Sequence, residues 1–472
     1  MTATIPSARW LALGVVLAVA AGAATALSPV AGASVAVLVL LGVVVLRFHG
    51  SAGMARVFLW LAALGPFLAT TEKTQQDVVT QQIATLDILR ALVPLVSLAV
   101  ALLLRRPVRR GIHMVDWLLV AYLAFLGVST VWSIGPSQTL MKALLLSVTF
   151  LALGLLVRTY ETLEDALRGL SVFVHVLLWA ECLQILIIPS QAYYADTDLV
   201  PRLRSVVPTI ADNPLAYVAV LGLLQLVVGI GPAWTLRMPT RALLFLAYAG
   251  ILLGTRTRTS VLLAVLLLVF ALAMVARERV GALLLLMVGS TVGIMVATLM
   301  SSTVASYLLR GQNAENVSTL TGRTPVWNQA VAYWSEAPWL GHGFYAGHRL
   351  GLPPLPGTVA HSNLDNTWLE TLVDVGLVGT LLLSLFVLLG VLGVFRCLRG
   401  AEASTRILVV ATLAYGFVVS FVNPSLQMNG VAQIFLGFVI LAGAARLPTR
   451  HRLVSAPTAA PAPALPAFAG SL

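Results

Sequence analysis

Side chains that can transfer protons and bind anions gather in one polar stretch of the chain, from 321 to 379. Its polar residues include His342, His348, His361, Arg323, Asp365 and Asn366. Histidine and aspartate can accept a proton from a reacting hydroxyl, and arginine carries a permanent charge that binds oxyanions. Because the rest of the chain is almost wholly apolar, we expect the chemistry of this protein to take place here.

The composition places the chain in a lipid bilayer. It has 472 residues, of which 59% are hydrophobic and 10% are charged, whereas a soluble domain carries about 25% charged residues. The net charge of +11 therefore reflects which loops face the cytoplasm and does not indicate nucleic-acid binding. Cys182 and Cys397 lie far apart in apolar segments and indicate neither a disulfide framework nor a metal site. Arginine dominates over lysine and Ala, Gly, Val and Pro are frequent, which indicates a GC-rich bacterial genome.

About fourteen windows of the chain are apolar enough to cross a membrane, which takes ~20 residues. They lie at 10–27, 30–46, 56–70, 83–104, 114–132, 139–157, 168–188, 213–230, 241–254, 260–276, 281–300, 366–394, 407–422 and 431–445. We predict an all-α integral membrane protein, a polytopic helical bundle of about 12–14 transmembrane helices with one large extracytoplasmic loop. A signal peptide is the alternative for the first window, but we favour a retained span because a second one follows at once.

The chain divides into four parts. Residues 1–300 hold transmembrane helices with arginines in outer loops, 301–365 form the large extracytoplasmic loop, 366–452 hold the C-terminal transmembrane helices, and 453–472 form a disordered cytoplasmic tail. Arginines occupy alternate loops, as the positive-inside rule requires of cytoplasmic loops. Both termini are therefore expected in the cytoplasm, and the large loop outside.

Some arginines lie in outer loops, against this rule: Arg202, Arg204, Arg256, Arg258, Arg310, Arg323 and Arg349. Because outward arginines oppose correct insertion, a bound anion is the simplest reason for them. The alternative is solvation or pairing with lipid headgroups, which we favour for Arg310 and Arg349. For Arg204, Arg258 and Arg323 we favour the anion.

Arg256 and Arg258 follow a short span, 241–254, which covers only ~20 Å at 1.5 Å per residue, so both lie in or near the outer interface. An arginine at the middle of a bilayer costs roughly 2.5–3.5 kcal/mol, and such residues commonly line a cavity. Other spans carry polar residues near their outer ends: Asp87, Arg90, Lys142, Glu181 and Gln184. Together they predict an outward-open polar cavity beneath the large loop, although a structural ion pair is the alternative for Asp87 and Arg90.

The large loop has local structure of its own. An apolar face with helical spacing from Trp327 to Trp334 predicts an amphipathic helix on the membrane surface. A glycine-rich turn holds His342. For His342, a structural role is the alternative to a role in the site. His348 is expected to be solvated.

The loop ends where the next helix begins. Asp365, Asn366 or Thr367 is expected to cap that helix. A plain capping role is therefore the alternative to chemistry for Asp365.

Four features of the chain resemble the O-antigen ligase and O-antigen polymerase superfamily of bacterial membrane proteins. They are an outer-loop arginine before Asn213-Pro214, the Arg258-Thr259-Ser260 run that opens a span, Gly322-Arg323-Thr324-x-x-Trp327, and the loop-to-helix junction from Asp365 to Gly379. The resemblance implies an enzyme that joins glycans carried on a polyprenyl diphosphate, at the outer face of the bacterial cytoplasmic membrane. It implies no metal, nucleotide sugar or other cofactor.

We predict that Arg204, Arg256, Arg258, Arg323, His342 and Asn366 bind the substrate. Many ligases have His-Asn where this chain has Asp365-Asn366, and His361 lies four residues earlier. The base that deprotonates the acceptor hydroxyl is therefore His361, Asp365 or the two as a pair, and the choice between ligase and polymerase stays open. Attack opposite the diphosphate would invert the anomeric centre.

We favour a metal-independent, inverting membrane glycosyltransferase. Its donor would be a polyprenyl-diphosphate-linked glycan and its acceptor a glycan or a lipid, with membrane lipids and other polysaccharide-assembly proteins as partners. A flippase or transporter of polysaccharide or lipid-linked oligosaccharide is the alternative. Internal repeats and charges spread through a central cavity are typical of that class, and the sequence shows neither pattern. A non-catalytic assembly scaffold is a third possibility without a feature of its own.

Overall fold

The computed structural model describes residues 55–63, 85–104, 111–194, 201–205, 210–230, 237–276, 323–352, 364–422 and 431–448. Several sequence-based expectations lie outside these residues: the spans at 10–27, 30–46 and 281–300, the tail 453–472, Arg310 and His361.

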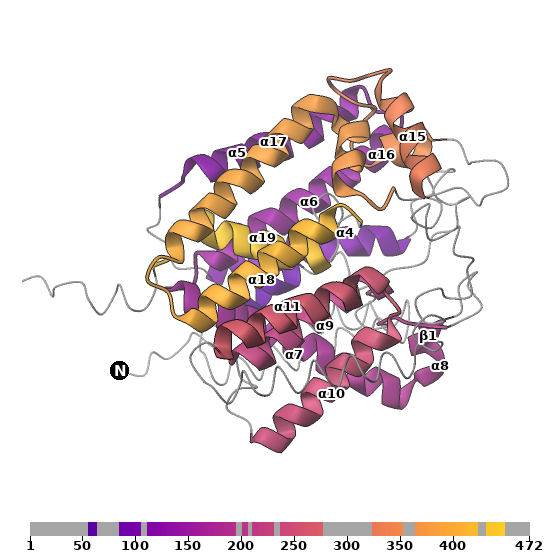
Figure 1. Cartoon of the computed structure of the whole chain (residues 1–472). Coiled ribbons are helices and arrows are strands. Elements are labelled where there is room, and N and C mark those ends of the chain that lie inside the picture. The colour runs from indigo at the N-terminus through magenta and orange to yellow at the C-terminus, as the bar shows by residue number, and fades with distance from the viewer. Residues whose placement is uncertain are drawn as a thin grey trace, which may run out of the picture.

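Helices account for almost all of the described chain (Figure 1). The longer ones are α4 (Thr85–Leu104), α5 (Met114–Val128), α6 (Pro136–Val157), α7 (Leu163–Ile187), α9 (Asp212–Val228), α10 (Met238–Gly254), α11 (Arg258–Ala276), α17 (Thr367–Cys397), α18 (Ala403–Ser420) and α19 (Val431–Ala444). The shorter ones are η2 (Ser129–Val131), α8 (Pro189–Ala192), α15 (Arg323–Trp334) and α16 (Ala346–Leu350). Two short strands, β1 (Tyr193–Tyr194) and β2 (Arg202–Leu203), pair antiparallel.

Six of the described helical segments are long and apolar enough to cross a membrane: Met114–Val131, Pro136–Val157, Leu163–Ile187, Arg258–Val275, Thr367–Cys397 and Ala403–Ser420. Four shorter apolar ones are Pro94–Leu103, Asp212–Val228, Met238–Gly254 and Ile434–Ala444. The prediction of an all-α polytopic membrane protein is confirmed. The total of about 12–14 spans stays a prediction, because it includes windows outside the described residues.

Some helices begin before the apolar windows that predicted them. α7 begins at Leu163, because the Thr162 side chain caps it by accepting the N–H of Asp165 at 3.1 Å, whereas the apolar window began at 168. α6 begins at Pro136, in the first turn where proline lacks only an N–H that would have no helical partner. A window chosen by apolarity misses such polar, capped first turns.

Small residues let α17 and α19 lie very close together. A Cβ at Gly393 of α17 would stand 2.8 Å from the carbonyl oxygen of Gly443 in α19. Close backbone contact of this kind is typical of helices packed within membranes. Between them these helices hold the C-terminal part of the bundle against α5 and α6.

α17 is broken at Gly376, where the sequence predicted one continuous span from 366 to 394. Gly376 has φ 63° and ψ −164°, a combination open essentially to glycine alone. The break separates a short first half, up to Val375, from a long second half. It also frees backbone N–H and C=O groups, which the interior of a membrane protein cannot leave unsatisfied.

The segment 338–343 of the polar stretch supplies partners at this break. Four backbone hydrogen bonds join them: Leu377 N–H to Pro338 O (2.9 Å), Val378 N–H to Trp339 O (3.2 Å), His342 N–H to Val373 O (3.1 Å) and Gly343 N–H to Asp374 O (2.8 Å). The polar stretch is therefore bound to α17 by backbone hydrogen bonds and does not simply cover the bundle.

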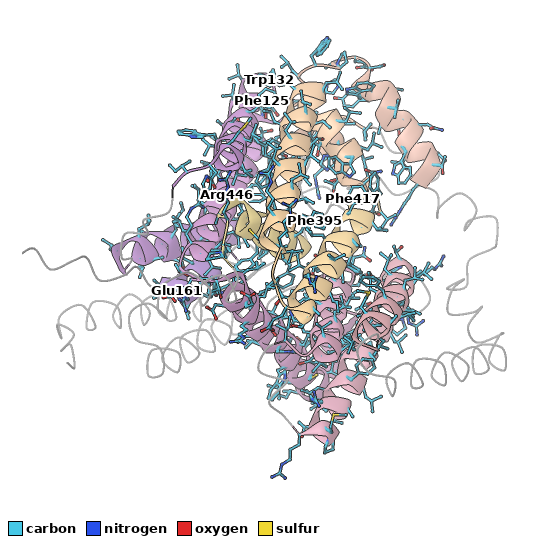
Figure 2. The ribbon with its side chains drawn as sticks, turned by 60° about the vertical axis from the view of Figure 1, so that its left-hand side comes forward. Phe125, Trp132, Glu161, Phe395, Phe417 and Arg446 are labelled. Carbon is cyan, nitrogen blue, oxygen red and sulfur yellow. The ribbon has the colours of Figure 1, made fainter. Side chains whose placement is uncertain are left out.

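The turn between α5 and α6 holds the same segment from its other side. Four more hydrogen bonds form there: Trp132 Nε1–H to Leu340 O (3.1 Å), Ile134 N–H to His342 O (3.1 Å), Phe344 N–H to Ser129 Oγ (3.1 Å) and Thr139 Oγ1–H to Phe344 O (2.8 Å). Phe125 and Trp132 stand beside each other at the top of Figure 2, with ring centroids 5.8 Å apart. The polar stretch is thus clamped between two parts of the transmembrane bundle.

Gly376→Ala should destabilise the protein by about 2–5 kcal/mol, because it adds backbone strain and overpacking. The new Cβ would lie 2.6 Å from the backbone nitrogen of Leu340. The matched control is Gly250→Ala in α10, where a Cβ meets nothing within 4 Å and a helical alanine is favourable. Thermal unfolding of the full-length protein in detergent measures both; equal midpoints would contradict the proposed role of the break.

Candidate functional site

Most predicted site residues that the structure describes lie at one end of the bundle. Figure 1 shows α15 and α16 at the upper right, and β1 lower on the same side, where the turn from α10 to α11 also lies. Arg258 is the first residue of α11, Arg323 is the first residue of α15, and Asn366 precedes α17. The fold therefore brings these separate stretches of sequence to one region.

Arg323 and Asp365 form an ion pair in this region. Arg323 Nη2 lies 2.9 Å from Asp365 Oδ2, and both side chains are about 30% exposed. Arg323 Nη1 also donates to the carbonyl oxygen of Val422, just after α18, at 3.1 Å. The guanidinium is thus positioned by two fixed oxygens while part of it stays accessible to a ligand.

Asn366 is the residue that caps α17. Its Oδ1 accepts the N–H groups of Trp368 (3.0 Å) and Leu369 (3.1 Å). Asp365, with φ 51°, is left to face Arg323. The structure therefore separates the two roles that the sequence left open, giving the cap to Asn366 and the ion pair to Asp365.

The other predicted arginines surround the turn between α10 and α11. Arg256 lies within the turn at φ 54°, and Arg258 opens α11. Leu203 of β2 packs against Gly254 at the end of α10, so Arg204, the next residue in the chain, lies close to this turn.

α18 connects this turn to the ion pair. The Tyr415 hydroxyl near the end of α18 donates to Ser260 Oγ in the first turn of α11 at 2.8 Å. The residue that binds Arg323, Val422, follows Tyr415 by about two helical turns. Arg258 and Arg323 therefore lie at the same end of the bundle.

His342 has packing contacts that are typical of a structural residue. Its ring stacks on Tyr333, with centroids 3.8 Å apart, and its Nε2 lies 3.0 Å from the Tyr333 carbonyl oxygen. These contacts fit the structural alternative, and the substrate-binding role of His342 stays a prediction.

The expectation that His348 is solvated is wrong. Its side chain is 1% exposed, and its Nδ1 lies 2.9 Å from Oδ1 of Asp374, a fully buried residue. Burial by itself would lower the pKa of His348, but the carboxylates of Asp374 and Glu370 outweigh it and raise that pKa. His348 is therefore a buried partner of α17.

Glu370 lies one helical turn before Asp374, on the same face of α17. It is fully buried, and its Oε1 accepts the N–H of Leu364 at 3.0 Å. Within the described residues, its Oε2 and the Nε2 of His348 have no hydrogen-bond partner. Glu370 thereby holds Leu364, and with it the neighbouring Asp365, at the start of α17.

Lys142 of α6 and Arg349 of α16 converge on the ring of Tyr345. Lys142 Nζ lies 4.7 Å and Arg349 Cζ 4.4 Å from its centroid. The Arg349 side chain lies half-buried against this ring, and its expected solvation or pairing with lipid headgroups stays a prediction. Burial by itself would raise the pKa of Tyr345, but Arg349, Lys142 and His348 outweigh it and lower that pKa to about 8.

Sequence reasoning overlooked Asp374, Glu370 and Tyr345. Asp374 carried a usable signal, because an acidic residue inside a long apolar span is expected to have a partner and a role. It also stands two residues before Gly376, where the helix breaks. Tyr345 carried no such signal, because its surroundings come from another helix.

Other intramembrane polar residues lie beside this region or outside the described side chains. Glu181 of α7 is fully buried, and Gln184 Nε2 donates to Ser205 Oγ, next to Arg204, at 3.3 Å. The side chains of Asp87 and Arg90 are not among those described. Across the described ranges, no group of three His, Cys, Asp or Glu residues is arranged to hold a metal ion.

Comparisons with known proteins match the part of the chain that contains this region. A family model described as O-Antigen ligase matches residues 243–384, which include Arg258, Arg323 and Asp365. The exopolysaccharide production protein ExoQ of Rhizobium meliloti (strain 1021) is 27% identical over 156 residues. That alignment covers 29% of this chain and 33% of the relative, so the chain spans about a third of the relative's length. The resemblance to the O-antigen ligase and polymerase superfamily is confirmed.

The His348–Asp374 pair should make stability depend on pH. Because the pKa of folded His348 is raised, the pair's contribution is complete below about pH 6.5, the unfolded value, and is lost as pH rises through the folded value. Each unit of the shift corresponds to about 1.4 kcal/mol. Thermal unfolding in detergent, followed upward from about pH 6.5, should show this loss, and His348→Gln should lack it. Parallel curves for the two proteins would contradict the assignment.

Proposed function

We propose that this chain, which resembles the O-antigen ligase and polymerase superfamily, is a membrane glycosyltransferase that moves a glycan from a polyprenyl-diphosphate carrier to an acceptor hydroxyl. The observation that carries the proposal is the partly exposed Arg323–Asp365 pair, 2.9 Å apart. It joins a phosphate-binding side chain to a possible base within the matched residues 243–384.

The arginines would stabilise the leaving group. When the bond between the anomeric carbon and the phosphate oxygen breaks, negative charge develops on the diphosphate. A guanidinium remains charged and matches two phosphate oxygens at once. Arg323 and Arg258, with Arg204 and Arg256 beside the α10–α11 turn, would bind this charge in place of a metal ion.

A base is also needed, because the acceptor oxygen must lose its proton as it attacks. Asp365 is accessible and lies against Arg323, so a carboxylate there would take that proton beside the diphosphate. His361, four residues earlier and outside the described residues, remains the alternative base. Attack on the face opposite the diphosphate would invert the anomeric centre.

The site would face outward from the bacterial cytoplasmic membrane, with both chain termini in the cytoplasm. The outer position follows from the arginine distribution along the sequence. The acceptor would be a glycan or a lipid. The relative's description as an exopolysaccharide production protein favours a growing polysaccharide chain, and therefore a polymerase.

The arginine assignment is tested with purified protein in liposomes and a synthetic polyprenyl-diphosphate glycan. The wild type should release polyprenyl diphosphate. Arg258→Ala and Arg323→Ala should lower kcat/KM by roughly 10²–10³-fold, the usual cost of removing an oxyanion-stabilising group. Arg237→Ala is the matched control, because Arg237 is exposed at the opposite end of α10. Wild-type rates in both site variants would exclude a role of these arginines in transfer. Movement of the labelled lipid-linked glycan across the bilayer without transfer would favour a flippase.

The base is tested by comparing Asp365→Asn with His361→Gln in the same assay. The variant that removes the base should lower kcat by roughly 10²–10⁴-fold. The variant at the other position should keep most of the wild-type kcat. Asp365→Asn also removes the partner of Arg323, so KM must be followed separately. If neither variant slows transfer, the base lies elsewhere.

A further inference from the structure

A second group of charges lies beside the proposed site and takes no part in the proposed chemistry. Lys142 comes from the first turns of the spanning helix α6, and Arg349 comes from α16 in the polar stretch. Both lie within 5 Å of the centroid of the Tyr345 ring, at 4.7 and 4.4 Å. All three side chains are partly accessible, so a ligand can reach them.

The position of Tyr345 is imposed by its surroundings. It has φ 64° and ψ −34°, a conformation that costs a non-glycine residue about 1–3 kcal/mol and persists only where neighbouring structure enforces it. Here Asp374 enforces it, because Oδ2 accepts the Tyr345 N–H at 2.7 Å. Strain of this kind is concentrated at binding and catalytic sites.

The same carboxylate holds Arg349 in place. Asp374 Oδ1 accepts the backbone N–H of His348 at 2.8 Å and faces His348 Nδ1 at 2.9 Å. Arg349 directly follows His348, so α16 has one position relative to α17. The cationic group is therefore built before any ligand arrives, which reduces the entropy lost on binding.

The pKa of the Tyr345 hydroxyl reflects the positive electrostatic potential between Lys142 and Arg349. Its pKa is lowered to about 8 although burial opposes the charged form. The charges responsible are Arg349, Lys142 and His348. A field that stabilises a phenolate oxygen also stabilises an oxyanion brought by a ligand.

We propose that Lys142, Tyr345 and Arg349 form an oxyanion-binding subsite for a phosphate or carboxylate substituent on the glycan of the lipid-linked substrate, apart from its diphosphate. Lys142 and Arg349 would donate charge-assisted hydrogen bonds, and the protonated Tyr345 hydroxyl would donate another. The subsite would position the substrate and would take no part in bond breaking. It deepens the proposed function by assigning an anionic group to the substrate.

The subsite can be tested without any transfer reaction. The full-length protein in nanodiscs of zwitterionic lipid is titrated while tyrosinate absorbance is recorded, and the curve of Tyr345→Phe is subtracted. The difference should show one step near pH 8. Lys142→Met should move the step upward, and Lys142→Arg should keep it low. Arg406→Met, which removes an exposed charge on α18, is the matched control and should leave it unchanged.

Two probes then identify the anion. Inorganic phosphate stands for a phosphate substituent on a sugar, and glucuronate stands for a sugar carboxylate. A bound oxyanion should raise the pKa of Tyr345, because it competes with the phenolate for the same charges. The probe that raises the pKa of Tyr345 identifies the kind of anion that the subsite binds. Chloride at equal ionic strength is the reference. If Tyr345 titrates at its ordinary value or above, or if neither probe moves the step, the proposal is overturned.

The transfer assay separates this proposal from the proposed function. If the protein transfers glycan, Lys142→Met should raise KM while kcat stays close to wild type. Unchanged KM would overturn the subsite and leave the glycosyltransferase standing. Absence of transfer by the wild type would remove the proposed function, whereas the titration would still decide whether an oxyanion binds.

Discussion

A break in a membrane-spanning helix constrains the rest of this structure. At Gly376 the backbone leaves helical geometry, and the groups it frees need partners because lipid offers none. The segment 338–343 provides those partners and is held in turn by the α5–α6 turn. A polar stretch that would otherwise lie on the membrane surface is thereby built into the bundle.

The first half of α17 organises the site through two buried carboxylates on one face. Asp374 fixes Tyr345 and His348 through hydrogen bonds with both, because a buried charge is costly unless it is paired or hydrogen-bonded. Glu370, one turn earlier, binds Leu364 and so places Asp365 near Arg323. The two parts of the proposed site, the ion pair and the cationic subsite, therefore depend on the same short helical segment.

Sequence reasoning succeeded where a local property decides the outcome. The spans 114–132, 213–230 and 260–276 match α5, α9 and α11 closely, because span position depends on apolarity summed over ~20 residues. It failed where a distant partner decides. The window 366–394 looked continuous because apolarity carries no information about φ. His348 looked solvated because the residue that pairs with it, Asp374, lies 26 residues further along the chain.

By itself, the sequence determined the membrane class and the approximate position of most described spans, and it singled out Arg258, Arg323 and Asp365 as candidates for the site. The membrane class and the span positions follow from transfer free energies summed along the sequence and from the placement of charges in the loops. Only the tertiary structure decided that Asn366 caps α17 while Asp365 pairs with Arg323. It alone also placed Lys142 against Tyr345. Such contacts join residues far apart in the chain, and they arise only when helix packing and the break in α17 fix where each side chain lies.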